Sequence, residues 1–124
     1  MKILIIDDSQ QIVQLIQSVL EREGYQTAYA LDGLDGLRKT RQDLPDMVIL
    51  DLGLPKLPGE QVCKEIKKDD KTKNVSVVML TGKSSEADRI IGKVIGADYY
   101  MTKPCDIHEL LKITHSIQEL QHCS

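Results

Sequence analysis

Five short apolar runs, separated by segments with helical spacing, constrain the fold of this chain more than any other feature. The runs cover residues 3–6, 27–30, 47–50, 75–80 and 99–101, and the first and third are apolar at every position. Strands that are apolar on both faces belong in a parallel sheet with helices on each side. The pattern therefore predicts an α/β fold, a doubly wound five-stranded parallel sheet with helices on both faces.

The segments between these runs carry apolar residues that return after three or four positions, as on one face of a helix. Two such sets are Ile12, Leu15, Ile16, Val19 and Leu20, and Ile90, Ile91, Val94 and Ile95. A last helix is expected over residues 106–120, with these residues facing the core: Ile107, Leu110, Leu111, Ile113, Ile117 and Leu120. A strand and a helix thus alternate five times, and residues 1–124 are expected to form one domain.

Charge and cysteine content argue against several classes of protein. The 16 basic and 19 acidic side chains give a net charge of -3 and are interspersed, which indicates neither direct nucleic-acid binding nor a membrane partner. Cys63, Cys105 and Cys123 are odd in number and lack metal-ligand spacing, so neither a disulfide framework nor a zinc site is expected. With no signal peptide or long apolar stretch, the expected location is cytoplasmic.

Polar residues follow four of the predicted strands. Asp7 and Asp8 follow the first run, Asp51 the third, Thr81 the fourth and Lys103 the fifth. Any one of them could be a helix cap or a turn residue, but parallel strands bring their carboxyl ends to one edge of the sheet. Two like charges ~4 Å apart at an effective dielectric near 20 repel by about 4 kcal/mol, so an acidic cluster there requires a cation.

Mg²⁺ fits that cluster, because it prefers oxygen ligands and usually shares its shell with a phosphate. Lys103 would supply a positive charge, and Thr81 a hydroxyl donor, for phosphoryl oxygens. The chain has no G-x-x-x-x-G-K-[ST] loop, and Gly33 and Gly36 follow the second run instead of forming G-x-G-x-x-G after the first. Phosphoryl-transfer chemistry is therefore indicated, and nucleotide binding is not.

The motifs around these residues resemble the receiver domains of bacterial two-component response regulators over essentially the whole chain. The likeness lies in ILIIDDSQ, MVILDLGLP, PKLPG, VVMLTG and GADYYMTKP, which occur in the order and at the spacing of that family. It implies a (βα)5, flavodoxin-like receiver domain over residues 1–124. It also implies a phosphorylation-operated signalling switch, which is no metabolic enzyme but assists its own phosphorylation and slow dephosphorylation.

The resemblance also implies roles for the acidic residues. Asp51 would accept the phosphoryl group from a sensor histidine kinase or a histidine phosphotransfer protein. Asp7, Asp8 and Asp51 would organise Mg²⁺, aided by the backbone carbonyl of Gly53. The transfer would therefore depend on Mg²⁺.

A switch is implied by the same resemblance. Thr81 and Lys103 would hold the phosphoryl oxygens, and Tyr100 corresponds to the family's switch aromatic. Phosphorylation would draw Thr81 toward the phosphate, turn Tyr100 inward and remodel the face of helix four, strand five and helix five. That face would meet a downstream protein target, a fused output domain or a second copy in a phosphorylation-dependent homodimer.

Two further positions correspond to those where the family tunes the lifetime of the phosphate. Gly53 stands two positions beyond the acceptor, and Lys83 stands two beyond the threonine. A glycine would leave the site open to water, whereas Lys83 could pair with the phosphoryl group. These effects oppose each other, so no lifetime is predicted.

Other positions depart from the family pattern. Cys105 stands where an aromatic residue is common, Tyr99 where a second acid is frequent, and the chain has no Phe. Thr114 and His115 lie where helix five of the winged-helix regulators often carries arginine. These departures weaken the case for the charged dimer interface of those regulators.

Three alternatives can be weighed against the sequence. A haloacid dehalogenase-type phosphatase needs a D-x-D signature, but position +2 from each candidate aspartate holds Ser9, Gln10 or Gly53. A flavin carrier needs a phosphate-cradling loop after the first strand, and none is present. A receiver-like interaction module that is never phosphorylated would not need the full set of three aspartates, a threonine and a lysine.

Overall fold

One five-stranded parallel sheet forms the centre of the molecule, with the strands in the order β2-β1-β3-β4-β5. The computed structural model describes residues 1–81, 96–103 and 105–122. The strands are β1 (Lys2–Ile6), β2 (Gln26–Ala30), β3 (Met47–Asp51), β4 (Ser76–Thr81) and β5 (Tyr99–Thr102). The helices in these ranges are α1 (Gln10–Arg22), α2 (Gly33–Asp43), α3 (Gly59–Lys68) and α5 (Ile107–His122).

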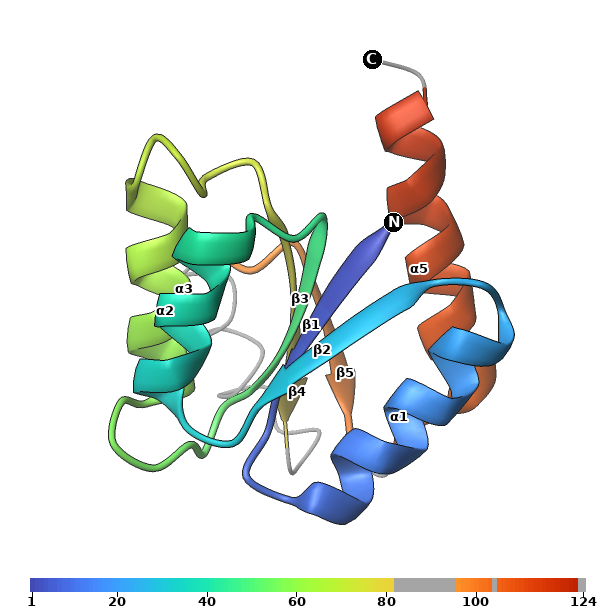
Figure 1. Ribbon diagram of the computed structural model, residues 1–124, viewed down its shortest axis with the longest axis horizontal. Helices are drawn as coiled ribbons and strands as arrows, with labels where there is room; N and C mark the ends of the chain where they lie inside the picture. The colour runs from blue at the N-terminus through green and yellow to red at the C-terminus, as the bar shows by residue number, and fades with distance from the viewer. Residues whose placement is uncertain (82–95, 104, 123–124) are drawn as a thin grey trace.

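Helices cover both faces of the sheet, with α2 and α3 on one side and α1 and α5 on the other (Figure 1). Successive side chains of a strand point to opposite faces, so each buried strand supplies both layers of the core. In β1, Ile3 and Ile5 pack on the α1 and α5 side, whereas Leu4 and Ile6 pack on the α2 and α3 side. The predicted doubly wound α/β architecture is confirmed, and the predicted fourth helix, with Ile90 to Ile95, lies outside the described residues.

The helices α1 and α2 begin at a side-chain cap, whereas α3 begins after Pro58, which makes no such hydrogen bond. Ser9 caps α1, because its Oγ accepts a hydrogen bond from the Ile12 amide at 3.4 Å, and Asp32 caps α2 by accepting from the Asp35 amide at 2.8 Å. The helix α1 ends before Gly24, whose φ of 91° is left-handed and favours glycine. Local caps thus mark the starts of α1 and α2, and the apolar face of each of these helices packs on the sheet.

The helix α5 ends two residues later than expected, and fewer of its apolar residues are buried in the core than the sequence predicted. Leu110 and Ile117 are each 1% exposed, with Thr114 buried between them. The prediction was wrong for Ile107 and Leu120, which are 39% and 65% exposed. Figure 1 shows the last turns of α5 extending past the sheet, so a residue near the end of the helix, such as Leu120, has no core beneath it to pack against.

Neither Cys63 nor Cys105 forms a disulfide within the described part of the chain, and Cys123 lies outside it. Burial raises the pKa of the Cys63 thiol to about 11, which keeps it protonated and unreactive at neutral pH. Within the described ranges, no helix combines the length and the apolar character needed to cross a membrane.

Candidate functional site

Four neighbouring strands deliver the candidate residues to one edge of the sheet. Asp7 directly follows β1, Asp51 ends β3, Thr81 ends β4, and Lys103 directly follows β5. These strands are adjacent, and the strand order reverses between β1 and β3, where open α/β sheets bind ligands. Asp51 and Thr81 were expected just beyond their strands but are the final strand residues, so sheet pairing fixes their backbones.

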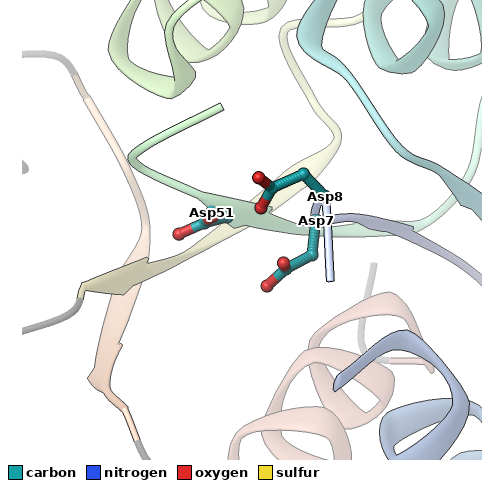
Figure 2. A group of neighbouring side chains, drawn as sticks. All are labelled: Asp7, Asp8 and Asp51. Atoms are coloured by element: carbon teal, nitrogen blue, oxygen red, sulfur yellow. The ribbon is translucent and has the colours of Figure 1, made fainter. Parts of the chain in front are cut away.

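Asp7, Asp8 and Asp51 form an acidic cluster at this edge. One carboxylate oxygen from each residue lies within 4.8 Å of the others. Figure 2 shows the three carboxylates pointing toward a shared space beside β1 and β3. Asp7 is fully buried, Asp51 is 7% exposed and Asp8 is exposed, so the cluster opens to solvent on the side of Asp8.

Asp7 is the most constrained of the three acids. Its Oδ1 accepts a hydrogen bond from the Ser9 amide at 2.9 Å. Its Oδ2 lies 3.2 Å from Lys103 Nζ, but among the described residues it has no partner with hydrogen-bond geometry. Burial raises the pKa of Asp7, and the nearby Asp51 charge adds to this, against the opposing effects of the Ser9 amide and Lys103.

Lys103 bridges acids from two different strands. Its Nζ lies 3.2 Å from Asp7 Oδ2 and 3.2 Å from Asp51 Oδ1. Its backbone amide donates to the Thr81 carbonyl at 2.7 Å, which anchors the residue beside the end of β4. Burial opposes the charge on Lys103, but attraction to Asp51 and Asp7 outweighs it and raises the pKa of the ammonium.

Among the residues that the structure describes, this arrangement has an excess of negative charge. The three carboxylates of the cluster face one ammonium group there, and an oxygen of the buried Asp7 lacks a hydrogen bond. Buried charges are stable only when they are paired or coordinate a metal. Carboxylate oxygens are ligands that Mg²⁺ prefers, so the donor set fits a hard divalent cation.

The other predicted site residues have different surroundings. Thr81 is 3% exposed, and its hydroxyl donates to the Met101 carbonyl at 3.3 Å. Tyr100 is partly buried and packs against the core on the α2 and α3 side of the sheet. Gly53, two residues after Asp51, is exposed, and a Cβ added there would meet nothing within 4 Å, whereas Lys83 lies outside the described residues.

Gly59 supports β3 in a way that the sequence motif did not reveal. A Cβ at this position would lie 2.2 Å from the Asp51 carbonyl oxygen, closer than real Cβ contacts come. Its amide also donates to the Leu52 carbonyl at 3.1 Å. The start of α3 can therefore approach the backbone of Asp51 only because position 59 has no side chain.

A separate cleft of about 250 Å³ lies at the opposite edge of the sheet, at the amino ends of β1 and β2. Its lining includes Lys2, Gln26, Asp43 and Pro45. None of the predicted site residues lines it. The chemistry of the side chains, and not the size of a cavity, therefore identifies the candidate site.

Replacing Asp7 with asparagine is expected to raise the free energy of unfolding by about 1 kcal/mol at pH 7 in metal-free buffer, because a buried charge is removed. In the wild type the folded-state pKa of Asp7 is raised above its usual value of 3.8. The contribution of Asp7 to the free energy of unfolding of the wild type is therefore fully present below pH 3.8, and it is lost as pH rises through the folded-state pKa. Urea denaturation of both proteins across this pH range measures the difference.

The exposed Asp43 of α2 provides the matched control. Asp43→Asn should leave the free energy of unfolding within about 0.5 kcal/mol of the wild type. If Asp7→Asn were less stable than the wild type at pH 7, the view of Asp7 as a strained, buried acid would be wrong.

Comparison with known families gives a consistent result. The family model described as the response regulator receiver domain matches residues 3–115. The transcriptional regulatory protein PhoP of alkaline phosphatase synthesis in Bacillus subtilis is 43% identical over 109 residues, covering 88% of this chain and 45% of PhoP. Protein PilH of Pseudomonas aeruginosa is 38% identical over 116 residues, covering 94% of this chain and 96% of PilH.

Solved structures of receiver domains have the same fold. The receiver domain of the Francisella response regulator 1452 superposes with a TM-score of 0.90 at 30% identity, covering 97% of this chain and 98% of that one. The chemotaxis protein CheY4 of Vibrio cholerae gives a TM-score of 0.87 at 30% identity, with 94% and 97% coverage. The chain spans less than half the length of PhoP and nearly all of PilH.

Proposed function

Because the chain belongs to the response regulator receiver domain family of two-component systems, we propose that it is a signalling switch that accepts a phosphoryl group on Asp51. One observation carries the proposal. Asp51 lies within 4.8 Å of two further carboxylates and 3.2 Å from an ammonium group, and these groups come from three different strand ends. Such a set positions an acceptor, a metal site and a counter-charge together.

Asp7, Asp8 and Asp51 would hold Mg²⁺, with the backbone carbonyl of Gly53 completing the protein ligands. The fit rests on the charge excess of the cluster and on the oxygen of Asp7 that lacks a hydrogen bond within the described residues. When bound, Mg²⁺ supplies positive charge that offsets the repulsion between the cluster and an incoming phosphoryl group.

In the proposed transfer, a carboxylate oxygen of Asp51 attacks the phosphorus in line with the bond to the donor. A new P–O bond forms, and the P–N bond of a phosphohistidine breaks, with the electron pair leaving on the imidazole nitrogen. Lys103 stays protonated, because its pKa is raised, and it lies where it can pair with a phosphoryl oxygen. A sensor histidine kinase or a histidine phosphotransfer protein would be the donor.

Thr81 and Tyr100 would transmit the change. The Thr81 hydroxyl now donates to the Met101 carbonyl, and a phosphoryl oxygen near Asp51 is a stronger, charged acceptor. Rotation of this hydroxyl toward the phosphate would alter the packing beside Tyr100, which precedes Met101 in β5. The remodelled face would then bind a downstream protein, a fused output domain or a second copy of the chain.

The proposal is tested by incubating the protein with Mg²⁺ and acetyl phosphate and measuring its intact mass. We expect a gain of one phosphoryl group, which a chelator prevents and which hydroxylamine removes, since hydroxylamine cleaves acyl phosphates. An unchanged mass would instead support a receiver-like interaction module that is never phosphorylated. A gain that resists hydroxylamine would show that the acceptor is not a carboxylate.

A further inference from the structure

The loop from β3 to α3, residues 52–58, begins directly after Asp51 and contains a strained turn. The Leu57 amide donates to the Pro55 carbonyl at 2.8 Å, and the intervening Lys56 has a φ of 67°. This hydrogen bond and this φ define the rare form of the three-residue γ-turn. Such conformations persist only when the surrounding structure holds them, so something must hold this loop.

The first turn of α2 holds the loop at two points. The Gly33 amide donates to the same Pro55 carbonyl at 3.2 Å. The ammonium group of Lys56 lies 3.6 Å from Oδ2 of Asp32, the residue that also caps α2. The strained turn is therefore bound to the start of α2 through the Pro55 carbonyl and through the Lys56 side chain.

Gly33 also makes a backbone contact that no other residue could make. A Cβ at this position would lie 2.0 Å from the carbonyl oxygen of Leu57 and 2.8 Å from its Cβ, whereas real Cβ contacts stay above 3.0 Å. No left-handed φ is involved, so space alone requires the glycine. A methyl group there would force the loop to retreat by at least about 1 Å.

The loop has little freedom to absorb such a change. At its far end, Gly59 packs against the Asp51 backbone, with a distance of 2.2 Å from a hypothetical Cβ to the Asp51 oxygen. At its near end, the Leu52 amide donates to the Leu80 carbonyl at 3.1 Å. Gly53, between these fixed ends, belongs to the segment that would have to move.

We propose that Gly33 is a positioning residue for the metal site. Its close contact with the β3–α3 loop fixes the position of that loop, and so determines where Gly53 lies relative to Asp7 and Asp51. The inference rests on the proposed function, since it assumes that this edge of the sheet binds Mg²⁺. Gly33 itself touches neither the acids nor the metal. Its effect passes through the backbone of residues 52–58, which a substitution would displace.

The test compares Gly33→Ala with Gly24→Ala. Gly24 lies in the α1–β2 turn at the opposite edge of the sheet and has a φ of 91°, and a Cβ added there would meet nothing within 4 Å. Both substitutions should destabilise the protein, one through a clash and the other through backbone strain. The readout is the Mg²⁺ dissociation constant, measured by calorimetric titration at a temperature where both variants are folded.

Gly33→Ala is expected to raise the Mg²⁺ dissociation constant by about tenfold, since changing a group that orients the metal ligands costs about 10–100-fold in metal affinity. Gly24→Ala should leave it within about twofold of the wild type, because its turn lies at the other edge of the sheet. Equal Mg²⁺ dissociation constants for the two variants would overturn the positioning role of Gly33 but not the proposed metal site. Failure of the wild type to bind Mg²⁺ would overturn the proposed metal site and this inference together.

A second pair of variants applies if Gly33→Ala does not fold. Lys56→Gly keeps the contact between Gly33 and Leu57 and permits positive φ without strain, but it removes the ion pair to Asp32, so it serves as the reference for the double variant. In Gly33→Ala/Lys56→Gly, the more permissive turn lets the loop retreat from the new methyl group. The double variant should bind Mg²⁺ about tenfold more weakly than Lys56→Gly, and equal binding would overturn the proposal.

Discussion

Asp51→Asn is expected to abolish phosphorylation by acetyl phosphate, with a loss of at least about 10³-fold in rate, while the fold is retained. The amide is nearly the same size as the carboxylate, and Asp51 is held in β3 by pairing with β4, so the backbone should not move. An amide oxygen, however, is a poor nucleophile and cannot form the acyl phosphate. Intact mass spectrometry with saturating Mg²⁺ measures the loss.

The control for this experiment is Asp43→Asn, which removes an exposed carboxylate of α2 and should be phosphorylated at the wild-type rate. Peptide mapping of the wild type should place the phosphoryl group on the peptide that contains Asp51. A full mass gain in Asp51→Asn would mean that another residue accepts the group. The assignment of the acceptor would then be wrong, although the acidic cluster could still bind a metal.

Lys103→Met is expected to lower the free energy of unfolding by about 2 kcal/mol in metal-free buffer at pH 7, because it leaves two acids uncompensated. Loss of one partner of a fully buried pair costs about 3–5 kcal/mol, and the 23% exposure of Lys103 reduces that figure. Saturating Mg²⁺ should narrow the difference, since a bound cation offsets the same charges. Urea denaturation with and without Mg²⁺ measures both effects.

The pH dependence of this difference follows from the raised pKa of Lys103. Its stabilising contribution is fully present below its ordinary value of 10.5 and is lost as pH rises through the higher folded-state pKa. The difference in the free energy of unfolding between the wild type and Lys103→Met should therefore be constant near neutral pH and should disappear only in strong alkali. Lys64→Met, on an exposed position of α3, should show no gap, and a stable, Mg²⁺-insensitive Lys103→Met would contradict the bridging role.

Lys103→Met should also slow phosphorylation by about 100-fold at saturating Mg²⁺, because a charge aimed at the transferring phosphoryl group is lost. This effect is separable from the loss of stability, since the rate is measured on folded protein. Together with Asp51→Asn, it distinguishes the acceptor from the group that assists the transfer.

Much of the fold could be predicted from the sequence, because strand and helix periods are local properties. The runs in β1 and β3 are apolar on both faces, and alternate side chains do enter opposite layers of the core. The position of Asp7 directly after a strand could be predicted for the same reason. Leu120 was placed in the core wrongly, because a helical period does not say where the sheet beneath the helix ends.

The candidate site was predictable as a set of residue types but not as a geometry. Asp7, Asp51 and Lys103 are each recognisable at a strand end, but their mutual distances depend on which strands are neighbours. Strand order is a tertiary property, and in the order β2-β1-β3-β4-β5 Lys103 Nζ lies 3.2 Å from an oxygen of each of two acids. The switching roles of Thr81 and Tyr100 stay predictions, as do the effects of Gly53 and Lys83 on the lifetime of the phosphate, and Lys83 lies outside the described residues.

The layered α/β fold and the chemical groups available at one edge of the sheet both follow from local patterns, so the sequence alone was enough to specify them. How those groups are held depends instead on the packing of distant segments. The contact between Gly33 and Leu57 joins a helix to a loop of another strand, and its cause is the space between two backbones. No local pattern encodes that space, because it exists only after the helices have packed on the finished sheet.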